Sequence, residues 1–373
     1  MNPHADVILI GGGIFGQFAA LTLAEAGRQV VLIDRAALWS EASSVNAGSL
    51  GVQNKLTELV PYARWSWELW SRMSERLAAD VGVSRGGGYK VAMTDDEAAR
   101  LVATAHEQRA AGLDVRLLDR DDLRAQTPWL SREVVAATFS PEDGYASPTL
   151  VGPALRAAIE RAGVRIVEHA RVASVQRRDG IVVETDRGAF RSKVLGITAG
   201  AWSARCAAML GATLPIALDV NMVAVTESAP PTIAAMTSHA RGILTLKQVA
   251  NRSCLIGGGW QGIGTLDDRR KEVDYDQLVH NLRLAVRVVP GLARLNVLRS
   301  WAGYEGVTPD SLPYLGQLGE DADVFVGACA RGGFTLGPIF GQLLGELIAT
   351  GSTSRPIDLF NPGRFAYVES AND

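Results

Sequence analysis

The sequence predicts an α/β fold in which an α+β domain with an antiparallel sheet is inserted into a domain built on a parallel sheet. Residues 7–33 read as an apolar strand, a glycine turn, a helix and a second apolar strand, the order of a parallel βαβ unit. Residues 214–298 contain β-rich runs and one helical segment at 275–289, which indicates an antiparallel sheet with helices. A strand at 324–326 and a helix at 336–349 then return the chain to the first pattern.

The length and charge of the chain limit the classes of protein to which it can belong. A chain of 373 residues predicts about two domains. We expect residues 1–85, 140–213 and 299–373 to form one domain and residues 86–139 and 214–298 to form the other. A net charge of −3 gives no reason to expect a nucleic-acid partner. The first apolar run, at 7–10, is too short for a signal peptide or a membrane span, so we expect a cytoplasmic protein.

Cysteines and histidines give no sign of a metal site. Cys206, Cys254 and Cys329 lie far apart and form no CxxC pair, which argues against a zinc ribbon or an iron–sulfur cluster. Unpaired cysteines fit a reducing compartment, and we expect them to pack as small apolar side chains. The five histidines are scattered and lie in no recognisable motif, so we expect no metal ligands and no histidine acid–base dyad.

The remaining elements follow from apolar spacing and from turn residues. In a helix predicted at 62–81, Trp65, Leu69, Met73 and Leu77 form an apolar stripe that we interpret as core. Arg178-Asp179-Gly180 between two apolar runs predicts a hairpin. Further helices are predicted at 95–111 and 150–162, and further strands at 89–93, 164–167, 181–184 and 193–198.

A glycine motif within the βαβ unit predicts a dinucleotide site. Gly11, Gly13 and Gly16 match G-x-G-x-x-G, with Ile14 and Phe15 completing the motif. The glycines allow a tight turn, a close approach of backbone to a pyrophosphate, and close packing of helix on strand. The motif is weak alone, but here a strand precedes it, a helix follows it, and an acid ends the second strand. That acid, Asp34, can accept hydrogen bonds from ribose hydroxyls.

The position of this unit favours FAD over NAD. The βαβ unit lies at the N-terminus itself, and a second pass of strand, glycines and helix occurs near the C-terminus. This arrangement suits a cofactor that extends across the whole first domain. FAD is the longer of the two cofactors and carries its flavin to a remote site, so we expect FAD, with NAD as the weaker alternative.

Five segments, taken together, make the chain resemble a known family. They are the N-terminal unit ending in Asp34-Arg35, the Ser-and-Asn-Ala-Gly loop at 43–49, and residues 143–148, 196–202 and 301–316. With them the chain resembles the D-amino-acid oxidase family of FAD-dependent amine oxidoreductases, which includes glycine oxidase and sarcosine oxidase. The resemblance covers essentially the whole chain. Residues 51–55 look most like the flavin β-subunits of multi-component enzymes acting on proline, hydroxyproline, opines or glycine.

The resemblance implies an FAD-binding Rossmann-like domain of the glutathione-reductase type, with FAD held non-covalently. The residues around Cys329 match no attachment loop. The helix that starts at 332–335 is expected to direct its positive end at the pyrimidine side of the flavin. Val172 would meet adenine through its backbone, or is a plain strand valine. Beyond the glycine motif and Asp34, the expected FAD residues are Arg35, Ser43, Ser44, Asn46, Ala47, Gly48, Val172, Ala199, Gly200, Trp202, Gly303, Gly332, Gly333, Phe334 and Thr335.

The family reaction removes hydride from the carbon beside an amine nitrogen, and the resemblance places the substrate residues. Arg331 is the candidate for binding a substrate carboxylate, because a guanidinium group forms bidentate hydrogen bonds. Many relatives carry arginine where this chain has Glu305. That glutamate either binds a cationic group of the substrate or pairs with Arg331 or Arg299. The further pocket candidates are Lys55, Tyr304, Lys247 and Trp260.

The sequence therefore predicts an FAD-dependent oxidoreductase that oxidises the C–N bond of an amine or amino acid. D-amino acids, glycine, sarcosine, proline, hydroxyproline and opines are the candidate substrates. We expect the chain to act as the β-subunit of a multi-component dehydrogenase whose partner subunits carry a second redox centre. Two alternatives stay open at this point: a stand-alone oxidase that makes hydrogen peroxide, and a non-catalytic flavoprotein component that only relays electrons.

Overall fold

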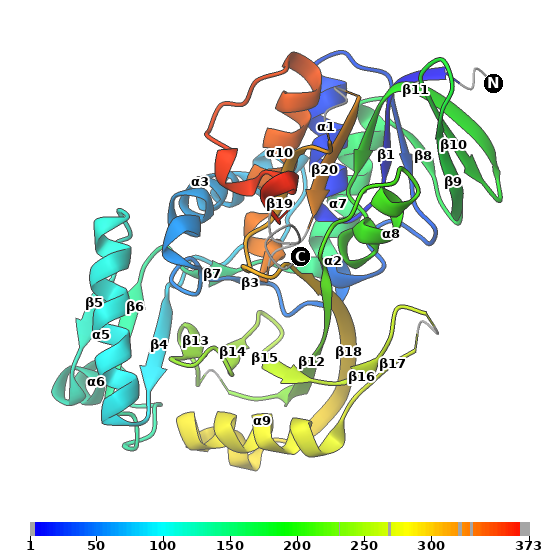
Figure 1. Cartoon of the computed structure of the whole chain (residues 1–373). Helices are drawn as coiled ribbons and strands as arrows, with labels where there is room; N and C mark the ends of the chain where they lie inside the picture. The colour runs from blue at the N-terminus through cyan, green and yellow to red at the C-terminus, as the bar shows by residue number, and fades with distance from the viewer. Residues whose placement is uncertain (1–3, 231, 268–269, 320–322, 329–330, 366–373) are drawn as a thin grey trace, which may run out of the picture.

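Two eight-stranded sheets organise the computed structural model, which describes residues 4–230, 232–267, 270–319, 323–328 and 331–365. In Figure 1 the first sheet and its helices occupy the upper part of the molecule and the second sheet the lower part. The N-terminal strand lies in the first sheet, and the last helix packs beside it. The described part of the chain thus starts and finishes beside the first sheet and enters the second sheet twice, at 88–140 and at 217–307.

The first sheet has the order β19-β20-β11-β1-β2-β8, and its central pairs are parallel. Its central strands are apolar and buried on both faces, as a parallel sheet covered by helices requires. The predicted hairpin is confirmed, because β9 and β10 pair antiparallel. At the turn between them, Asp179 and Gly180 have left-handed φ values of 49° and 98°. The strands are β1 (His4–Ile10), β2 (Val30–Ile33), β8 (Arg165–Val167), β9 (Val172–Arg177), β10 (Ile181–Thr185), β11 (Gly188–Ile197), β19 (Tyr314–Gln317) and β20 (Val324–Ala328).

Helices α1 (Ile14–Glu25) and α10 (Gly333–Thr350) pack against each other in close contact. Gly337, Gly341 and Gly345 line the contact on α10, and a Cβ added at Gly341 would lie 2.4 Å from Cβ of Phe18. Small residues at this spacing let the two backbones approach. The packing fixes the N-terminus of α10 relative to the glycine turn that precedes α1.

The helix predicted at 62–81 is wrong in two respects, because the structure breaks it in two and ends the second part at Leu77. Helix α3 (Val60–Ser71) ends at Arg72, whose φ is −111°, and α4 (Met73–Leu77) follows. Met73 and Leu77 are buried as expected, but Trp65 and Leu69 are only partly buried. Ser66 Oγ and Trp70 Nε1 both donate to the carbonyl of Thr335, at 2.6 and 3.0 Å. These bonds turn a different face of α3 toward α10.

The second sheet has the order β18-β12-β15-β14-β13-β4-β6-β5 and is antiparallel, as predicted, except that β13 and β4 are parallel. Helix α9 (Tyr275–Val288) packs on it, and α5 (Asp95–Ala110) and α6 (Arg120–Gln126) lie near β4, β5 and β6. The strands are β4 (Gly88–Ala92), β5 (Arg116–Leu118), β6 (Ala136–Ser140), β12 (Ala217–Ser228), β13 (Met236–His239), β14 (Thr245–Gln248), β15 (Ser253–Gln261) and β18 (Val297–Val307). The boundary expected at residue 299 falls inside β18.

Short elements complete the described chain. Helix α2 (Ala42–Val45) follows β2, α7 (Pro148–Arg161) contacts α1, and α8 (Ser203–Ala208) follows β11. The strand pairs β3 (Ser49–Leu50) with β7 (Gly144–Tyr145) and β16 (Ile263–Gly264) with β17 (Lys271–Glu272) form two small sheets. Within the described residues, no helix combines the length and apolar character needed to span a bilayer. The same residues contain no cluster of potential metal ligands.

Candidate functional site

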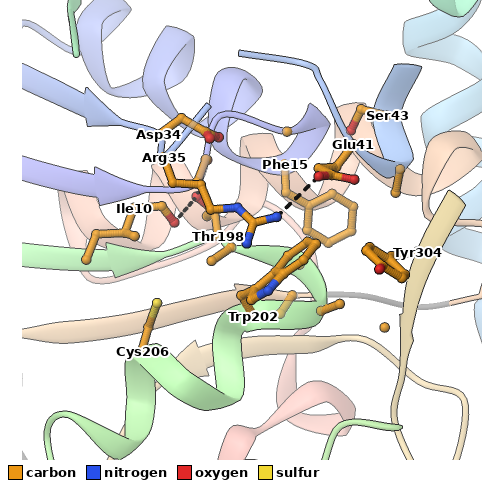
Figure 2. Close-up of a pocket in the computed structure, with 18 of the residues that line it drawn as sticks. Ile10, Phe15, Asp34, Arg35, Glu41, Ser43, Thr198, Trp202, Cys206 and Tyr304 are labelled. Carbon is orange, nitrogen blue, oxygen red and sulfur yellow. Dashed lines mark hydrogen bonds and ion pairs between the residues drawn. The ribbon is translucent and has the colours of Figure 1, made fainter. Parts of the chain in front are cut away.

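A cavity of about 490 Å³ lies where the first sheet meets β18 of the second. Its walls come from the turn before α1, the loop after β2, the start of β9, the segment after β11, and the residues that precede and begin α10. A cavity of this size falls in the range of sites that enclose a small ligand. Figure 2 shows Asp34, Arg35, Glu41, Trp202 and Tyr304 around it.

The glycine turn is held tightly against the end of β11. Gly11 has a φ of +111°, and a Cβ there would lie 2.4 Å from the carbonyl oxygen of Thr198. Thr198 Oγ1 lies 2.7 Å from the carbonyl oxygen of Gly11 and 3.1 Å from that of Ile10. Helix α1 then starts at Ile14, after the N-cap Gly13, with its positive end at the cavity, where Ile14 donates its N–H to Ser43 Oγ at 2.9 Å. This cradle of small residues and helix N-terminus fits a diphosphate.

Asp34 ends β2 and faces the same cavity. Its Oδ2 accepts the N–H of Gly12 at 2.7 Å and its Oδ1 accepts the N–H of Ala36 at 2.9 Å. Burial raises the pKa of Asp34, while these two N–H groups act in the opposite direction. A carboxylate has about four acceptor positions, so positions remain for two ligand hydroxyls. The residue is suited to a ribose.

Another part of the cavity wall holds a cationic side chain stacked on an aromatic ring. The Arg35 guanidinium carbon lies 3.6 Å from the ring centroid of Trp202, and Arg35 Nη2 lies 3.2 Å from Glu41 Oε1 (Figure 2). Lys271 of β17 also forms an ion pair with Glu41. Trp202 Nε1 is buried and has no hydrogen-bond partner within the described residues. An indole N–H in this state is a donor that an acceptor of a bound dinucleotide would satisfy.

At the other end of the cavity, two charged side chains converge on Gly332, the residue before α10. Glu305 Oε1 accepts the N–H of Gly332 at 2.9 Å, and Glu305 Oε2 accepts the side-chain amide of Asn221. Lys55 Nζ donates to the carbonyl oxygen of Gly332 at 2.9 Å. Burial raises the pKa of Glu305 and lowers the pKa of Lys55 to about 8, although each charge stabilises the other.

Arg331 points toward Asp219 rather than forming a direct ion pair with Glu305. Its Nη2 lies 3.7 Å from Asp219 Oδ2, and 53% of its side chain is exposed. Arg299, the other partner considered for Glu305, is exposed on the first part of β18. Arg331 is therefore loosely held beside the cavity and accessible to an anion.

Two aromatic candidates have polar atoms engaged within the protein. The hydroxyl of Tyr304 lies 2.7 Å from the carbonyl oxygen of Thr265 and 2.6 Å from that of Arg270, next to the β16–β17 hairpin. Trp260 donates its indole N–H to the carbonyl of Ile243 at 2.7 Å. Tyr304 lines the cavity with its ring, whereas Trp260 lies outside the cavity wall.

Most of the predicted FAD residues line the cavity. Those that do are Gly11, Gly13, Ile14, Phe15, Asp34, Arg35, Ser43, Asn46, Val172, Ala199, Gly200, Trp202, Gly332, Gly333 and Phe334, together with Glu305 and Tyr304. Gly16, Ser44, Ala47, Gly48, Gly303, Thr335, Lys55 and Arg331 lie outside its wall. Ser44, expected to bind phosphate or ribityl oxygens, instead donates its hydroxyl to the carbonyl of Glu41 at 3.0 Å. Cys329 lies outside the described residues.

The sequence missed several wall residues. Leu266 and Asp267 reach the cavity from the β16–β17 hairpin, and Arg205 of α8 pairs with Asp267 at 2.5 Å. Cys206 also lines the wall, and burial raises the pKa of its thiol to about 11. No motif marks these positions. Leu266 and Asp267 reach the cavity only through the packing of the second sheet on the first, and Cys206 reaches it from α8.

Lys247 is buried away from the cavity wall and has an unusual environment. It is 1% exposed, and its Nζ donates to Ser49 Oγ at 2.6 Å. Burial lowers the pKa of Lys247 to about 7. Below that pH the folded protein carries a buried charge. Between about pH 7 and the ordinary pKa of lysine, only the unfolded chain keeps the proton, so the stability of the fold rises with pH.

We expect Lys247→Met to stabilise the protein most at acidic pH. Replacing a buried charge with an apolar side chain of similar volume is worth up to about 1–4 kcal/mol. The gain should be largest at about pH 6 and smaller at about pH 9, where Lys247 of the folded wild-type protein is already neutral. Urea unfolding of both proteins at the two pH values measures it. An equal difference at both values would show that the buried charge does not contribute to stability.

Together the parallel sheet, the glycine turn and the long cavity between two sheets define a dinucleotide-binding enzyme fold. The family model of FAD dependent oxidoreductases, DAO, matches residues 6–347, and the chain belongs to this family. It is an FAD-dependent enzyme of the amine and amino-acid oxidase or dehydrogenase class, and the cofactor and fold expected from the sequence are confirmed.

Three relatives illustrate the similarity. Glycine oxidase of Geobacillus kaustophilus is 31% identical over 365 residues, which cover 95% of each chain. One of the subunits of the opine oxidase of Rhizobium meliloti is 26% identical over 97% of this chain and 98% of its own. The crystal structure of L-proline dehydrogenase from P. horikoshii superposes with a TM-score of 0.90 and 26% identity, covering 97% of this chain and 98% of that chain.

Proposed function

We propose that this enzyme oxidises the C–N bond of a small amino acid or related amine, as the flavin-carrying component of a multi-component dehydrogenase. The observation that carries the proposal is the arrangement of one cavity. Asp34 and the glycine turn form one end, suited to the nucleotide half of FAD. Glu305 and Gly332 form the other, and Arg331 lies beside it, outside the wall. The flavin would reach the second end, beside charged groups suited to a zwitterionic substrate.

Bound FAD supplies the hydride acceptor, flavin N5. The substrate would lose hydride from the carbon next to its nitrogen, and water would hydrolyse the resulting imine to a carbonyl compound and ammonia, or an amine where the nitrogen carries a second carbon. The part of the protein is to bind and orient the substrate. Arg331 is accessible and only loosely paired, so it can turn to a substrate carboxylate and form two charge-assisted hydrogen bonds. Neighbouring Glu305 and Asp219 offer acceptors for the amine nitrogen.

The role within a larger assembly is supported by similarity to a relative whose name identifies it as one of the subunits of an opine oxidase. The second candidate is a stand-alone oxidase that makes hydrogen peroxide, which similarity to glycine oxidase supports over nearly the whole chain. The division into an FAD domain and a substrate domain fits the two sheets and belongs to the same proposal. The cytoplasmic location stays a prediction.

Anaerobic reduction of the bound flavin tests the proposal. We expect at least one of glycine, sarcosine, proline, hydroxyproline, a D-amino acid or an opine to bleach the flavin absorption of the purified protein. The reduced protein would then pass electrons to an artificial acceptor faster than to oxygen. Rapid hydrogen peroxide production by the single chain would favour the oxidase alternative. A flavin that none of these compounds reduces would contradict both.

A further inference from the structure

The N-terminus of α10 carries a negative side chain that comes from another part of the chain. Helix α10 is 18 residues long, and its first turn contains no acidic residue. Its N-cap, Gly332, has a φ of +73° and no side chain of its own. Glu305, at the end of β18 that faces this helix, accepts the N–H of Gly332 at 2.9 Å. A carboxylate thus occupies the place where the positive end of the helix meets the cavity.

Glu305 fits this place as an ionised group. Both of its oxygens accept a hydrogen bond, one from the backbone of Gly332 and one from the Asn221 amide. Gln261 fixes that amide by donating to Asn221 Oδ1 at 3.0 Å. The charged groups that face Glu305 are Lys55, Arg331 and Asp219; the two cations favour its ionised form, while burial and Asp219 raise its pKa.

Among these four charged groups, Glu305 is the one that lines the cavity wall. Lys55 binds the carbonyl side of Gly332 and lies outside the cavity wall, whereas Glu305 lines the wall. Arg331 is half-exposed and lies nearer to Asp219. The end of a helix is equivalent to roughly half a positive charge, so a full negative charge bonded to it outweighs the helix field at close range.

We propose that Glu305 sets the electrostatic field at the flavin. It offsets the positive end of α10 and thereby disfavours negative charge on the pyrimidine side of the flavin. The inference rests on the proposed placement of the flavin at this end of the cavity. Glu305 opposes the effect of a helix that directs its positive end at the pyrimidine side of the flavin, which by itself would stabilise negative charge there. A flavin in such a field has a lower midpoint potential and passes its electrons on more readily, which suits a protein that feeds a second redox centre.

Sulfite binding to the oxidised, FAD-loaded protein tests this without any amine substrate. Sulfite adds to flavin N5 and leaves negative charge on the pyrimidine side of the ring, so its affinity reports the local field. We expect Glu305→Gln to bind sulfite about tenfold more tightly than wild type, since one unit charge is removed at close range in a partly buried site. The midpoint potential should shift to a more positive value in the same variant. Absorbance titration and spectroelectrochemistry measure the two quantities.

Matched variants separate this effect from general changes of charge or fold. Asp219→Asn removes a carboxylate from the neighbouring strand that does not bond to α10, and should raise sulfite affinity by less than about threefold. Glu305→Asp keeps the charge but draws the carboxylate back from Gly332, so its sulfite affinity should lie between those of wild type and Glu305→Gln. If Glu305→Gln loses FAD on purification, Glu305→Ser provides a neutral variant with room for water.

Two outcomes would overturn the proposal. The first is an unchanged or weaker sulfite affinity in an FAD-loaded neutral variant of Glu305. The second is an equal gain in Asp219→Asn, which would assign the effect to the total charge of the pocket instead of to the bond with Gly332. Neither result depends on which amine the enzyme oxidises, so failure of this inference and failure of the proposed function are distinguishable.

Discussion

Replacing Gly16 with alanine is expected to yield a protein with less than a tenth of the wild-type FAD content. A Cβ at this position would lie 2.0 Å from the carbonyl oxygen of Gly11 and 2.6 Å from Thr198 Oγ1. Both of those atoms belong to the turn and strand end that shape the cradle for the diphosphate. The backbone must therefore open, and the N-terminus of α1 moves away from its ligand. Flavin absorbance per protein after purification measures the loss.

The same substitution should lower the free energy of unfolding by about 1–3 kcal/mol, the usual cost of overpacking a buried site. Gly291→Ala is the matched control, because the nearest neighbour of its new methyl group would be Thr232 Cγ2 at an ordinary 3.5 Å. This control should keep its FAD and its melting temperature. A yellow Gly16→Ala protein that melts with wild type would show that the turn tolerates a side chain.

The nucleotide half of the site could be predicted from the sequence because its signals are local. The turn at Gly11, the helix after it and Asp34 lie within about two dozen residues, and their spacing alone states their roles. The helix predicted at 95–111 is likewise confirmed as α5, and in the structure Thr94 caps it by accepting the N–H of Glu97. Such patterns depend on residues that are neighbours in the chain, so they can be recognised without knowledge of the tertiary packing.

The substrate half depends on residues that only the packing of two sheets brings together. Lys55, Glu305 and Gly332 converge from three distant parts of the sequence. The resemblance identified each as a candidate, but no periodicity indicates that two side chains bind opposite sides of one peptide unit. In the same way, amphipathic spacing does not encode the bonds from Ser66 and Trp70 of α3 to Thr335, which decide the face that α3 turns toward α10. Long-range hydrogen bonds therefore determine these parts of the structure, which local sequence patterns do not predict.

Arg331→Ala is expected to lower kcat/KM about 10- to 100-fold for whichever amino acid reduces the flavin fastest. A charge-assisted, bidentate bond to a carboxylate is worth about 1.5–3 kcal/mol, and alanine removes it entirely. The fold should be unaffected, because the Arg331 side chain is 53% exposed and its ion pair with Asp219 is long, at 3.7 Å. Most of the loss should appear in KM, since the carboxylate is bound before and during hydride transfer.

A comparison of substrates identifies which group Arg331 recognises. The methyl ester of the same amino acid has no carboxylate, so wild type and Arg331→Ala should oxidise it at similar rates. Arg299→Ala is the control variant, because that arginine is exposed on β18, outside the cavity wall, and its removal should leave both substrates unaffected. An equal loss for acid and ester in Arg331→Ala would assign the arginine to shaping the loop before α10, and carboxylate recognition would then have to come from another cation, for which Lys55, bonded to Gly332, is the candidate.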